Sequence, residues 1–546
     1  MRRWTGVGLA AILAAALAGS AWAQGQDKPV TPAWPVLTKN TVYTKDKPPA
    51  EPKLEDLPER ESVTQYGITW TFEKPARVGQ FVNGDFYVVG PVTVKALDPK
   101  PLYGADVPES EVNATQEKNA QQRVRNGFML NPPAKPEVAY DSGTKNFFRP
   151  ALIGKLPAAM KPGDSLVATI SMLKGIKINS QLKGTYERGA GDASPTRISA
   201  VLTCVAAPQP PDAFRPAFCD RQAKIYLARD LKRDLLPTLA ATKSIPKIAE
   251  YAGFTQKPWV GTGFFTFEQP MENMPGYGRE YGRVVGIAAL MLCTDLKPED
   301  KEPLLINFVQ VGIDLGAMVR GGHPGWEGFG GHGSGRKLPI VFAGLVLGDE
   351  QLANVNKNFP KAAFGEDEQT AYGDCWTGAK VVFTGHRAID ERTGIARGGT
   401  GPYEQKQPKD WTGIAGGPSR TGDKCSESYR RCCTSGTWPA MALVVHLMKA
   451  EKAWNHDAFF DYCDRWMYED DKDFLKTIQE GTGADYNKDW SRQGQTWEPF
   501  VNEMWAKYRA APGMPPTDGW KKQHDDSYLK NAIEKGPKPA APKAAE

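Results

Sequence analysis

The chain has 546 residues, 40% of them hydrophobic and 24% charged, and its 68 basic and 63 acidic side chains give a net charge of +5. This length predicts more than one domain, each able to build its own core. The two signs of charge are mixed along the sequence, which argues against a nucleic-acid-binding protein and leaves an acidic ligand open.

The first 23 residues predict a secretory signal peptide. Arg2 and Arg3 precede the apolar run Val7–Ala18, and Ala21-Trp22-Ala23 fits the small-residue pattern of a cleavage site. Its removal leaves 66 basic against 63 acidic side chains. No later run of about eighteen apolar residues stands out, so we expect a secreted or periplasmic protein without membrane insertion.

A linker and a β-rich domain are expected next. Residues 24–61 are rich in Pro, Lys and Glu, as linkers are. From residue 62 to 220 the apolar residues recur with period two, and Asn83-Gly84 between two β-rich runs is a strong hairpin signal. Further strands are expected at Ser165–Met172 and Arg197–Ala206. We predict a β-sandwich-like domain over 62–220.

The apolar pattern then changes to that of helices. The predicted helical segments are Ile225–Leu239, a helix starting near Ser244-Ile245-Pro246, Tyr281–Leu292, Leu304–Val319, Leu338–Leu347, Trp438–Met448, Asp457–Met467 and Pro499–Tyr508. Several of them are apolar on every face, which requires helices packed on helices in more than one layer. We therefore predict an all-α (α/α) toroid-like domain over 221–515, followed by a low-complexity tail over 516–546.

Eight cysteines in an exported chain favour disulfides. Cys204 and Cys219 bracket a Pro-rich loop and are the expected local pair; the sequence leaves the other connectivities open. No CxxC pair or zinc-like His spacing occurs, so no metal site is predicted.

The segment Gly321–Lys337 is the strongest candidate for a ligand-binding loop. It has eight glycines within residues 321–335, together with His323, His332, Trp326 and Arg336. Glycine allows backbone to approach a ligand closely and to adopt positive φ. A flexible turn between two buried helices is the simpler alternative.

Other loops of the helical region are also rich in His, Tyr, Arg and Trp, and in a toroid they would line one end. They are the segments 275–283, 370–376, 385–387 and 428–433.

This arrangement over residues 62–510 resembles the large secreted polysaccharide lyases that act on uronate polymers such as alginate, glucuronan or heparin-like chains. The His/Tyr/Arg loops and the run Trp454–Tyr462 carry the resemblance, although several such lyases place the toroid first and the β part second. The resemblance implies β-elimination on an acidic polysaccharide without a cofactor, and leaves room for a structural calcium.

A uronate lyase must neutralise the substrate carboxylate, remove the C5 proton and protonate the departing O4. His332 is the candidate base or neutraliser and Tyr429 the candidate acid. Arg336, Tyr372 and His386 are the further catalytic candidates. For substrate binding we expect Arg430 and Arg283 at carboxylates, Trp326 and Trp376 against sugar rings, and His323.

Two alternatives stay open at this point. A glycoside hydrolase would use carboxylates such as Glu280, Asp374 or Glu327, and a non-catalytic glycan-binding or envelope protein would use none. His456, Asp457, Asp461 and Asp464 could form a metal or carboxylate cluster, but helix-end charge and ion pairs explain them more simply.

Overall fold

The computed structural model describes residues 36–111, 119–173, 177–178, 188–189, 195–260, 270–274, 278–328, 331–385, 403–411, 427–483 and 493–524. The predicted signal peptide, His386 and the Pro/Ala/Lys-rich C-terminus lie outside these residues. The ordered chain reaches further than predicted at its end, because Trp520 is buried and its carbonyl accepts a hydrogen bond from the Lys380 N–H at 2.7 Å.

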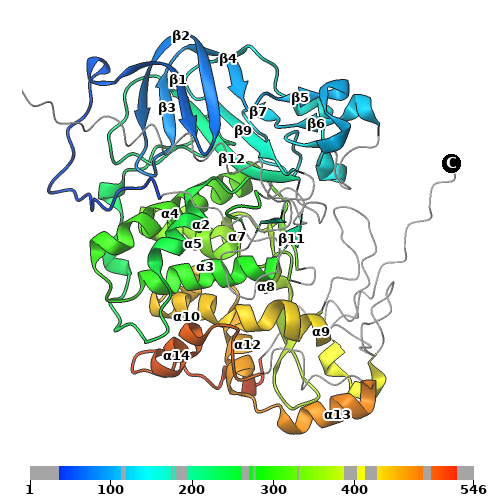
Figure 1. The fold of residues 1–546 in the computed structure, drawn as a ribbon. Coiled ribbons are helices and arrows are strands. Elements are labelled where there is room, and N and C mark those ends of the chain that lie inside the picture. Colours follow the sequence, from blue (N-terminus) through cyan, green and yellow to red (C-terminus); the bar gives the residue numbers. More distant parts are fainter. Residues whose placement is uncertain are drawn as a thin grey trace, which may run out of the picture.

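An eight-stranded, nearly closed sheet forms the N-terminal part and lies at one end of the molecule (Figure 1). Seven strands follow the order β7-β9-β12-β3-β2-β4-β8, and β1 pairs with β2. The long strand β2 joins the two halves of the sheet, since it pairs with β1 and β4 and also with β3. The strands are β1 (Glu59–Gln65), β2 (Ile68–Gln80), β3 (Phe86–Val89), β4 (Val92–Asp98), β7 (Phe128–Leu130), β8 (Ala158–Met160), β9 (Ser165–Ser171) and β12 (Thr196–Val205).

The predicted hairpin is confirmed. Strands β2 and β3 are antiparallel, with Gln80 opposite Phe86, and Gly84 in the turn between them has φ +86°. The two later strand predictions correspond to β9 and β12. Alternating apolar residues and an Asn-Gly turn were therefore sufficient to place these strands.

Strand β12 is buried along its whole length, because the sheet has hydrophobic cores on both sides. Ile198, Ala200 and Leu202 face the core inside the sheet. Val201 belongs to a second core that continues into the helices. The predicted boundary at residue 220 therefore divides the sequence, but the sheet and the helices pack together as one body.

A buried ion cluster also connects the two parts. Arg215 Nε donates to Asp85 in the β2–β3 turn at 2.6 Å, and its Nη1 donates to Asp314 of α4 at 3.1 Å. All three side chains are essentially without solvent exposure. Neither carboxylate could be removed without leaving a buried charge.

The helices pack in successive layers away from the sheet, with α2, α4 and α5 nearest to it and α12 and α14 at the far end (Figure 1). The longer helices are α2 (Ile248–Gln256), α3 (Gly278–Leu292), α4 (Pro298–Arg320), α5 (Lys337–Leu347), α10 (Pro439–Leu447), α12 (Asp457–Tyr468), α13 (Lys472–Thr482) and α14 (Pro499–Tyr508). The short ones are α6 (Glu350–Ala353), α7 (Val355–Asn358), α8 (Gly365–Glu368), α9 (Glu427–Tyr429) and α11 (Glu451–Trp454).

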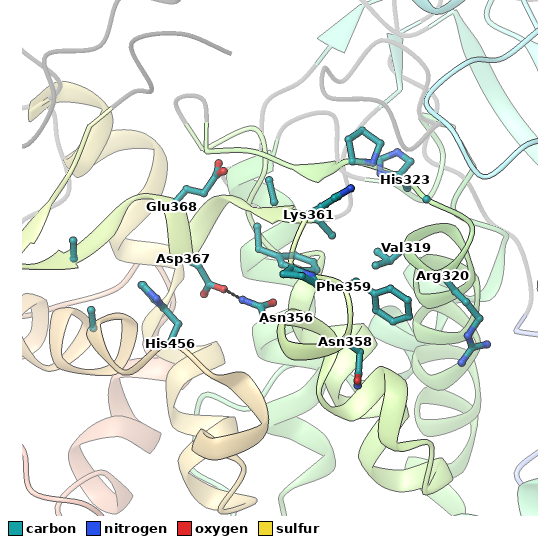
Figure 2. A pocket seen from close by; sticks show the side chains of 18 of the residues that line it. Val319, Arg320, His323, Asn356, Asn358, Phe359, Lys361, Asp367, Glu368 and His456 are labelled. Atoms are coloured by element: carbon teal, nitrogen blue, oxygen red, sulfur yellow. Dashed lines mark hydrogen bonds between the residues drawn. The ribbon is translucent and has the colours of Figure 1, made fainter. Parts of the chain in front are cut away.

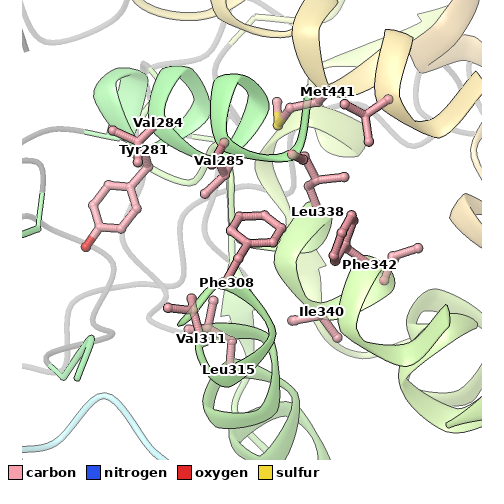
Figure 3. Close-up of a cluster of buried hydrophobic side chains, with 14 of the residues drawn as sticks. Tyr281, Val284, Val285, Phe308, Val311, Leu315, Leu338, Ile340, Phe342 and Met441 are labelled. Atoms are coloured by element: carbon pink, nitrogen blue, oxygen red, sulfur yellow. The ribbon is translucent and has the colours of Figure 1, made fainter. Parts of the chain in front are cut away.

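The all-apolar helices form the predicted multilayer core. Every residue of α3 is buried, and α3 packs with α4 and α5 around Phe308 and Phe342, whose ring centroids are 5.1 Å apart (Figure 3). Helix α4 is long and apolar enough to cross a membrane, but 94% of its most apolar stretch is buried inside the protein. It serves here as a core helix.

One predicted helix is wrong. Residues 225–239 form only two short 3-10 turns, Ala228–Asp230 and Arg233–Leu235. Their backbone bonds to other segments instead: the Ala228 N–H donates to the Asp212 carbonyl at 2.7 Å, and the Lys232 N–H to Val346 at 2.8 Å. Tertiary hydrogen bonds thus replace the helix that the local pattern favoured. Helix α13, conversely, was not predicted.

The helical part is not all-α, and the toroid is not confirmed. It contains a parallel ladder of β13 (Gly325–Trp326) with β14 (Ala363–Phe364). An antiparallel ladder joins β15 (Thr370–Tyr372) and β16 (Val381–Phe383). The first ladder pairs two residues of the glycine-rich loop, Gly325 and Trp326, with the segment that precedes α8.

The expected Cys204–Cys219 disulfide is not formed in this structure. Cys204 belongs to the core inside the sheet, next to Gly90, whereas Cys219 packs against the helical core. Burial raises the pKa of the Cys204 thiol to about 12, so this sulfur is a core side chain and a poor nucleophile.

Candidate functional site

The glycines of the loop allow its backbone to lie close to two other backbone segments, the start of α3 and the segment after α9. A Cβ at Gly331 would lie 2.0 Å from the Cys433 carbonyl oxygen, and one at Gly278 would lie 2.3 Å from that of His332. Gly333 is packed equally closely on Glu327 of the same loop. The glycines were predicted to allow close approach of a ligand. In the structure they allow close approach of the start of α3 and of the segment after α9.

His332 and Tyr429 lie on two of these touching segments. His332 follows Gly331 directly, and Tyr429 ends α9, four residues before Cys433. Both side chains are half-buried. Residues Arg430–Thr434 form a π-helical turn, a rare geometry that is frequent at functional sites. The structure thus places the candidate base and the candidate acid on two backbone segments that touch each other.

Arg336 holds the backbone of this loop through hydrogen bonds. Its Nη1 donates to the carbonyl oxygens of His332 at 2.8 Å and Ser334 at 2.7 Å. Its guanidinium carbon lies 3.7 Å from the centre of the Tyr281 ring, and the residue is only 3% exposed. In this arrangement Arg336 positions the backbone of His332, and direct contact with a substrate carboxylate would require it to leave these carbonyls.

Arg430 belongs to a buried ionic cluster. Its Nε donates to Glu427 at 2.8 Å and its Nη2 to Gln493 at 2.7 Å. Arg431 donates to the same Glu427 at 2.6 Å and to Asp471 at 2.6 Å. Burial opposes ionisation of Glu427, but the two arginines hold its pKa well below the ordinary value. Arg430 is thus a structural ion-pair partner here, not an exposed carboxylate ligand.

The cluster continues to Arg465, which bonds Glu404 at 2.9 Å and Glu469 at 2.9 Å. Trp376 lies at its edge and contacts Trp411 and Phe474 edge-on, with centroids 6.2 and 5.3 Å apart. Trp376 is half-buried and is held at this position by these two aromatic side chains.

Arg283 is also engaged in ion pairs. Its Nη1 donates to Glu280 at 2.6 Å and its Nε to Glu498 at 3.0 Å. Arg279 donates to the other oxygen of Glu280 at 2.6 Å and to the Cys432 carbonyl at 2.9 Å. Arg279 therefore ties α3 to the π-helical turn, and Glu280 is held by two arginines of its own helix.

The other two carboxylates of the hydrolase alternative, Asp374 and Glu327, differ in their exposure to solvent. Asp374 is exposed and pairs with Lys380 at 2.7 Å, while Glu327 is buried in the loop. Because Glu280 is already neutralised, no observation favours a flanking carboxylate pair.

A pocket of about 1210 Å³ is lined by the first part of the glycine-rich loop, at His323 (Figure 2). It lies between the end of α4, α7, α8, β15 and the start of α12. Its lining includes the side chains of His323, Asn356, Phe359, Lys361, Glu368 and His456.

His323 and Tyr372 are the two predicted site residues that line this pocket. The His323 ring stacks on Trp326, with centroids 4.7 Å apart, and its Nδ1 accepts the Gly325 N–H at 3.0 Å. Trp326 is 1% exposed and supports His323 instead of contacting solvent. Tyr372 donates its hydroxyl to Asp461 at 2.8 Å and stacks on His524.

Sequence reasoning missed two residues around the pocket, Lys361 and Glu366, and it considered His456 only together with its neighbouring aspartates. A lone lysine between Pro360 and Ala362 gives no signal. Glu366 is fully buried, and neither carboxylate oxygen makes a regular hydrogen bond, although the Gly335 N–H lies near. Burial, reinforced by Asp367, raises the pKa of Glu366 to about 7.

The aspartates of α12 have separate partners. Asp464 is buried and bonded to Arg509 at 2.8 Å, Asp461 accepts from Tyr372, and Asp457 is exposed at the helix start. Across the described parts of the chain, no three His, Cys, Asp or Glu side chains are grouped to hold a metal ion.

Comparisons of this chain with protein-family models, with curated proteins and with solved structures give no match. The function must therefore be argued from the geometry of the site.

Proposed function

We propose that this protein is an exported lyase that cleaves a uronic-acid-containing polysaccharide by β-elimination, with His332 as base and Tyr429 as acid. The observation that supports this most is the contact between Gly331 and the Cys433 carbonyl, because it joins the segments that carry the two side chains. Imidazole and phenol are the groups that this reaction requires.

In the proposed reaction His332 takes the C5 proton of the uronate. The electron pair of the broken C5–H bond forms a C4–C5 double bond, the C4–O4 bond breaks, and Tyr429 supplies a proton to O4. The backbone of His332 is held by Arg336 and by the close contact with Gly278. Because the backbone that carries the base is already held in place, substrate binding does not have to order it.

The structure changes which residue we propose as the group that neutralises the substrate carboxylate. Arg336 and Arg430 bond to carbonyl oxygens and to Glu427, respectively. We assign this role to His386, which the sequence offers as a further catalytic candidate and which lies outside the described residues. The reaction as proposed needs no metal or cofactor.

An assay on the purified protein distinguishes the candidate functions. Incubation with alginate, polygalacturonate, glucuronan and heparin should raise the ultraviolet absorbance of an unsaturated uronate with at least one polymer. New reducing ends without this chromophore would indicate a hydrolase. Retardation on an affinity gel with neither product would indicate a binding protein.

A further inference from the structure

The pocket between α7 and α12 carries groups of three chemical kinds that face one space. Figure 2 shows Lys361 and His323 together on one side, and Glu368 and His456 on the opposite side, with Phe359 and Asn356 between them. A cation, hydrogen-bonding groups and an apolar wall within one concave space are typical of a site for a polar organic ligand.

Lys361 is the unneutralised cation of this pocket. It is exposed and makes no hydrogen bond or ion pair within the described chain. The other basic groups nearby are compensated, since Arg320 bonds Asp349 at 3.0 Å and Lys337 bonds Asp367 at 2.5 Å. An anionic group of a ligand would therefore be drawn to the Lys361 side.

His456 offers an acceptor on the opposite side. Its Nε2 lies 3.0 Å from both the carbonyl and the hydroxyl oxygen of Thr370. The carbonyl can only accept, and the hydroxyl already donates to the Glu366 carbonyl at 2.9 Å, so Nε2 carries the proton. With the proton on Nε2, the neutral tautomer of this ring has a lone pair on Nδ1 that can accept a hydrogen bond.

Asn356 adds a second acceptor. Its Nδ2 donates to Asp367 at 2.6 Å, whereas its buried Oδ1 has no partner within the described chain. The Glu368 carboxylate, which receives the Gly328 N–H at 3.0 Å, also lines this side. Acceptors on this side suit the hydroxyl donors of a sugar, and Phe359 suits the apolar face of its ring.

We infer that this pocket is an anchoring subsite for an acidic sugar residue, with its carboxylate on Lys361, its hydroxyls on His456 and Asn356, and its ring against Phe359. The choice of a uronate as ligand rests on the proposed function. His323, which lines this subsite, and the proposed base His332 both belong to the glycine-rich loop.

Calorimetric titration in a Tyr429→Phe background tests the inference, because the proposed acid is absent and the ligand stays intact. The probes are an oligogalacturonate and a neutral cello-oligosaccharide of equal length. Lys361→Met should weaken binding of the acidic probe about tenfold, the loss expected for one charge-assisted hydrogen bond. Lys361→Arg should retain most of the affinity, and the neutral probe should change little.

Lys357→Met is the matched control, since Lys357 is an exposed lysine of α7 that does not line the pocket. Unchanged melting temperatures ensure that all variants are folded. Equal affinity of Lys361→Met and its background, or no saturable binding of the acidic probe, would overturn the inference. Elimination activity in the Lys361→Met single variant, together with unaltered binding in the Tyr429→Phe background, would leave the lyase proposal standing and remove only this subsite.

Discussion

The backbone of Gly331 packs directly on the carbonyl oxygen of Cys433, so closely that a side-chain Cβ at position 331 would lie 2.0 Å from that oxygen. Gly331 also has φ +85°. This contact joins the glycine-rich loop to the π-helical turn after Tyr429 and therefore sets where His332 lies relative to that tyrosine.

Gly331→Ala should separate these two segments. We expect a loss of stability on the order of 1–3 kcal/mol and a larger fractional loss of activity, because the base moves away from the acid. Thermal unfolding and the absorbance assay measure the two effects.

Gly322→Ala is the control for Gly331→Ala. Gly322 has nearly the same φ, +92°, but a Cβ there meets no atom within 4 Å. It introduces the backbone strain without the steric clash, so it should cost less stability and spare activity. Equal losses in the two variants would show that the contact with Cys433 is unimportant.

Glu366 should make the protein less stable as pH rises. Burial and Asp367 raise the pKa of this carboxyl to about 7 in the folded state, partly offset by its own backbone N–H and by Lys337. The folded protein therefore holds the proton more tightly than the unfolded chain. The resulting stabilisation is complete below pH of about 4.5 and is lost as pH rises to about 7, by about 3 kcal/mol.

Glu366→Gln should remove this dependence, because the amide resembles the protonated acid in shape and charge. Denaturant unfolding at pH 5 and pH 8 should show the variant gaining stability over the unsubstituted protein mainly at pH 8. Glu299→Gln, at an exposed position of α4, should leave the pH profile unchanged. A parallel profile for Glu366→Gln would refute the assignment of a buried neutral acid.

Arg430→Met should affect folding more than ligand affinity. It leaves Glu427 buried with one of its two arginines missing, and breaking a buried pair costs about 3–5 kcal/mol. Lys472→Met, an exposed substitution at the start of α13, should be nearly neutral. If Arg430→Met melts normally but binds acidic glycans poorly, Arg430 is a substrate ligand after all.

Local patterns predicted the elements whose stability is local or is set by burial. Asn83-Gly84 specified its hairpin, and the densely apolar residues of 284–292 specified a buried helix. Residues 225–239 failed because their backbone bonds to Asp212 and Val346, which lie on segments distant in sequence. Periodicity contains no information about such partners, nor about whether the helices close a ring.

The same distinction between local patterns and partners distant in sequence applies to the site. The sequence predicted that imidazole, phenol and guanidinium groups gather in a few loops, and His332, Arg336 and Tyr429 do lie on neighbouring segments. It could not predict that Arg336 and Arg430 bond to groups of the protein itself, because Glu427 and the carbonyls of His332 and Ser334 are ordinary residues in the sequence. Only the structure shows that Lys361 and His456 line the same pocket.

The absorbance assay on His332→Ala and Tyr429→Phe, run on whichever acidic polymer the unsubstituted protein cleaves, tests the central claim most directly. We predict that each variant loses at least about a hundredfold in elimination rate, as is typical when a general acid or base is removed, while its melting temperature stays within a few degrees. Full activity in both variants would contradict the account.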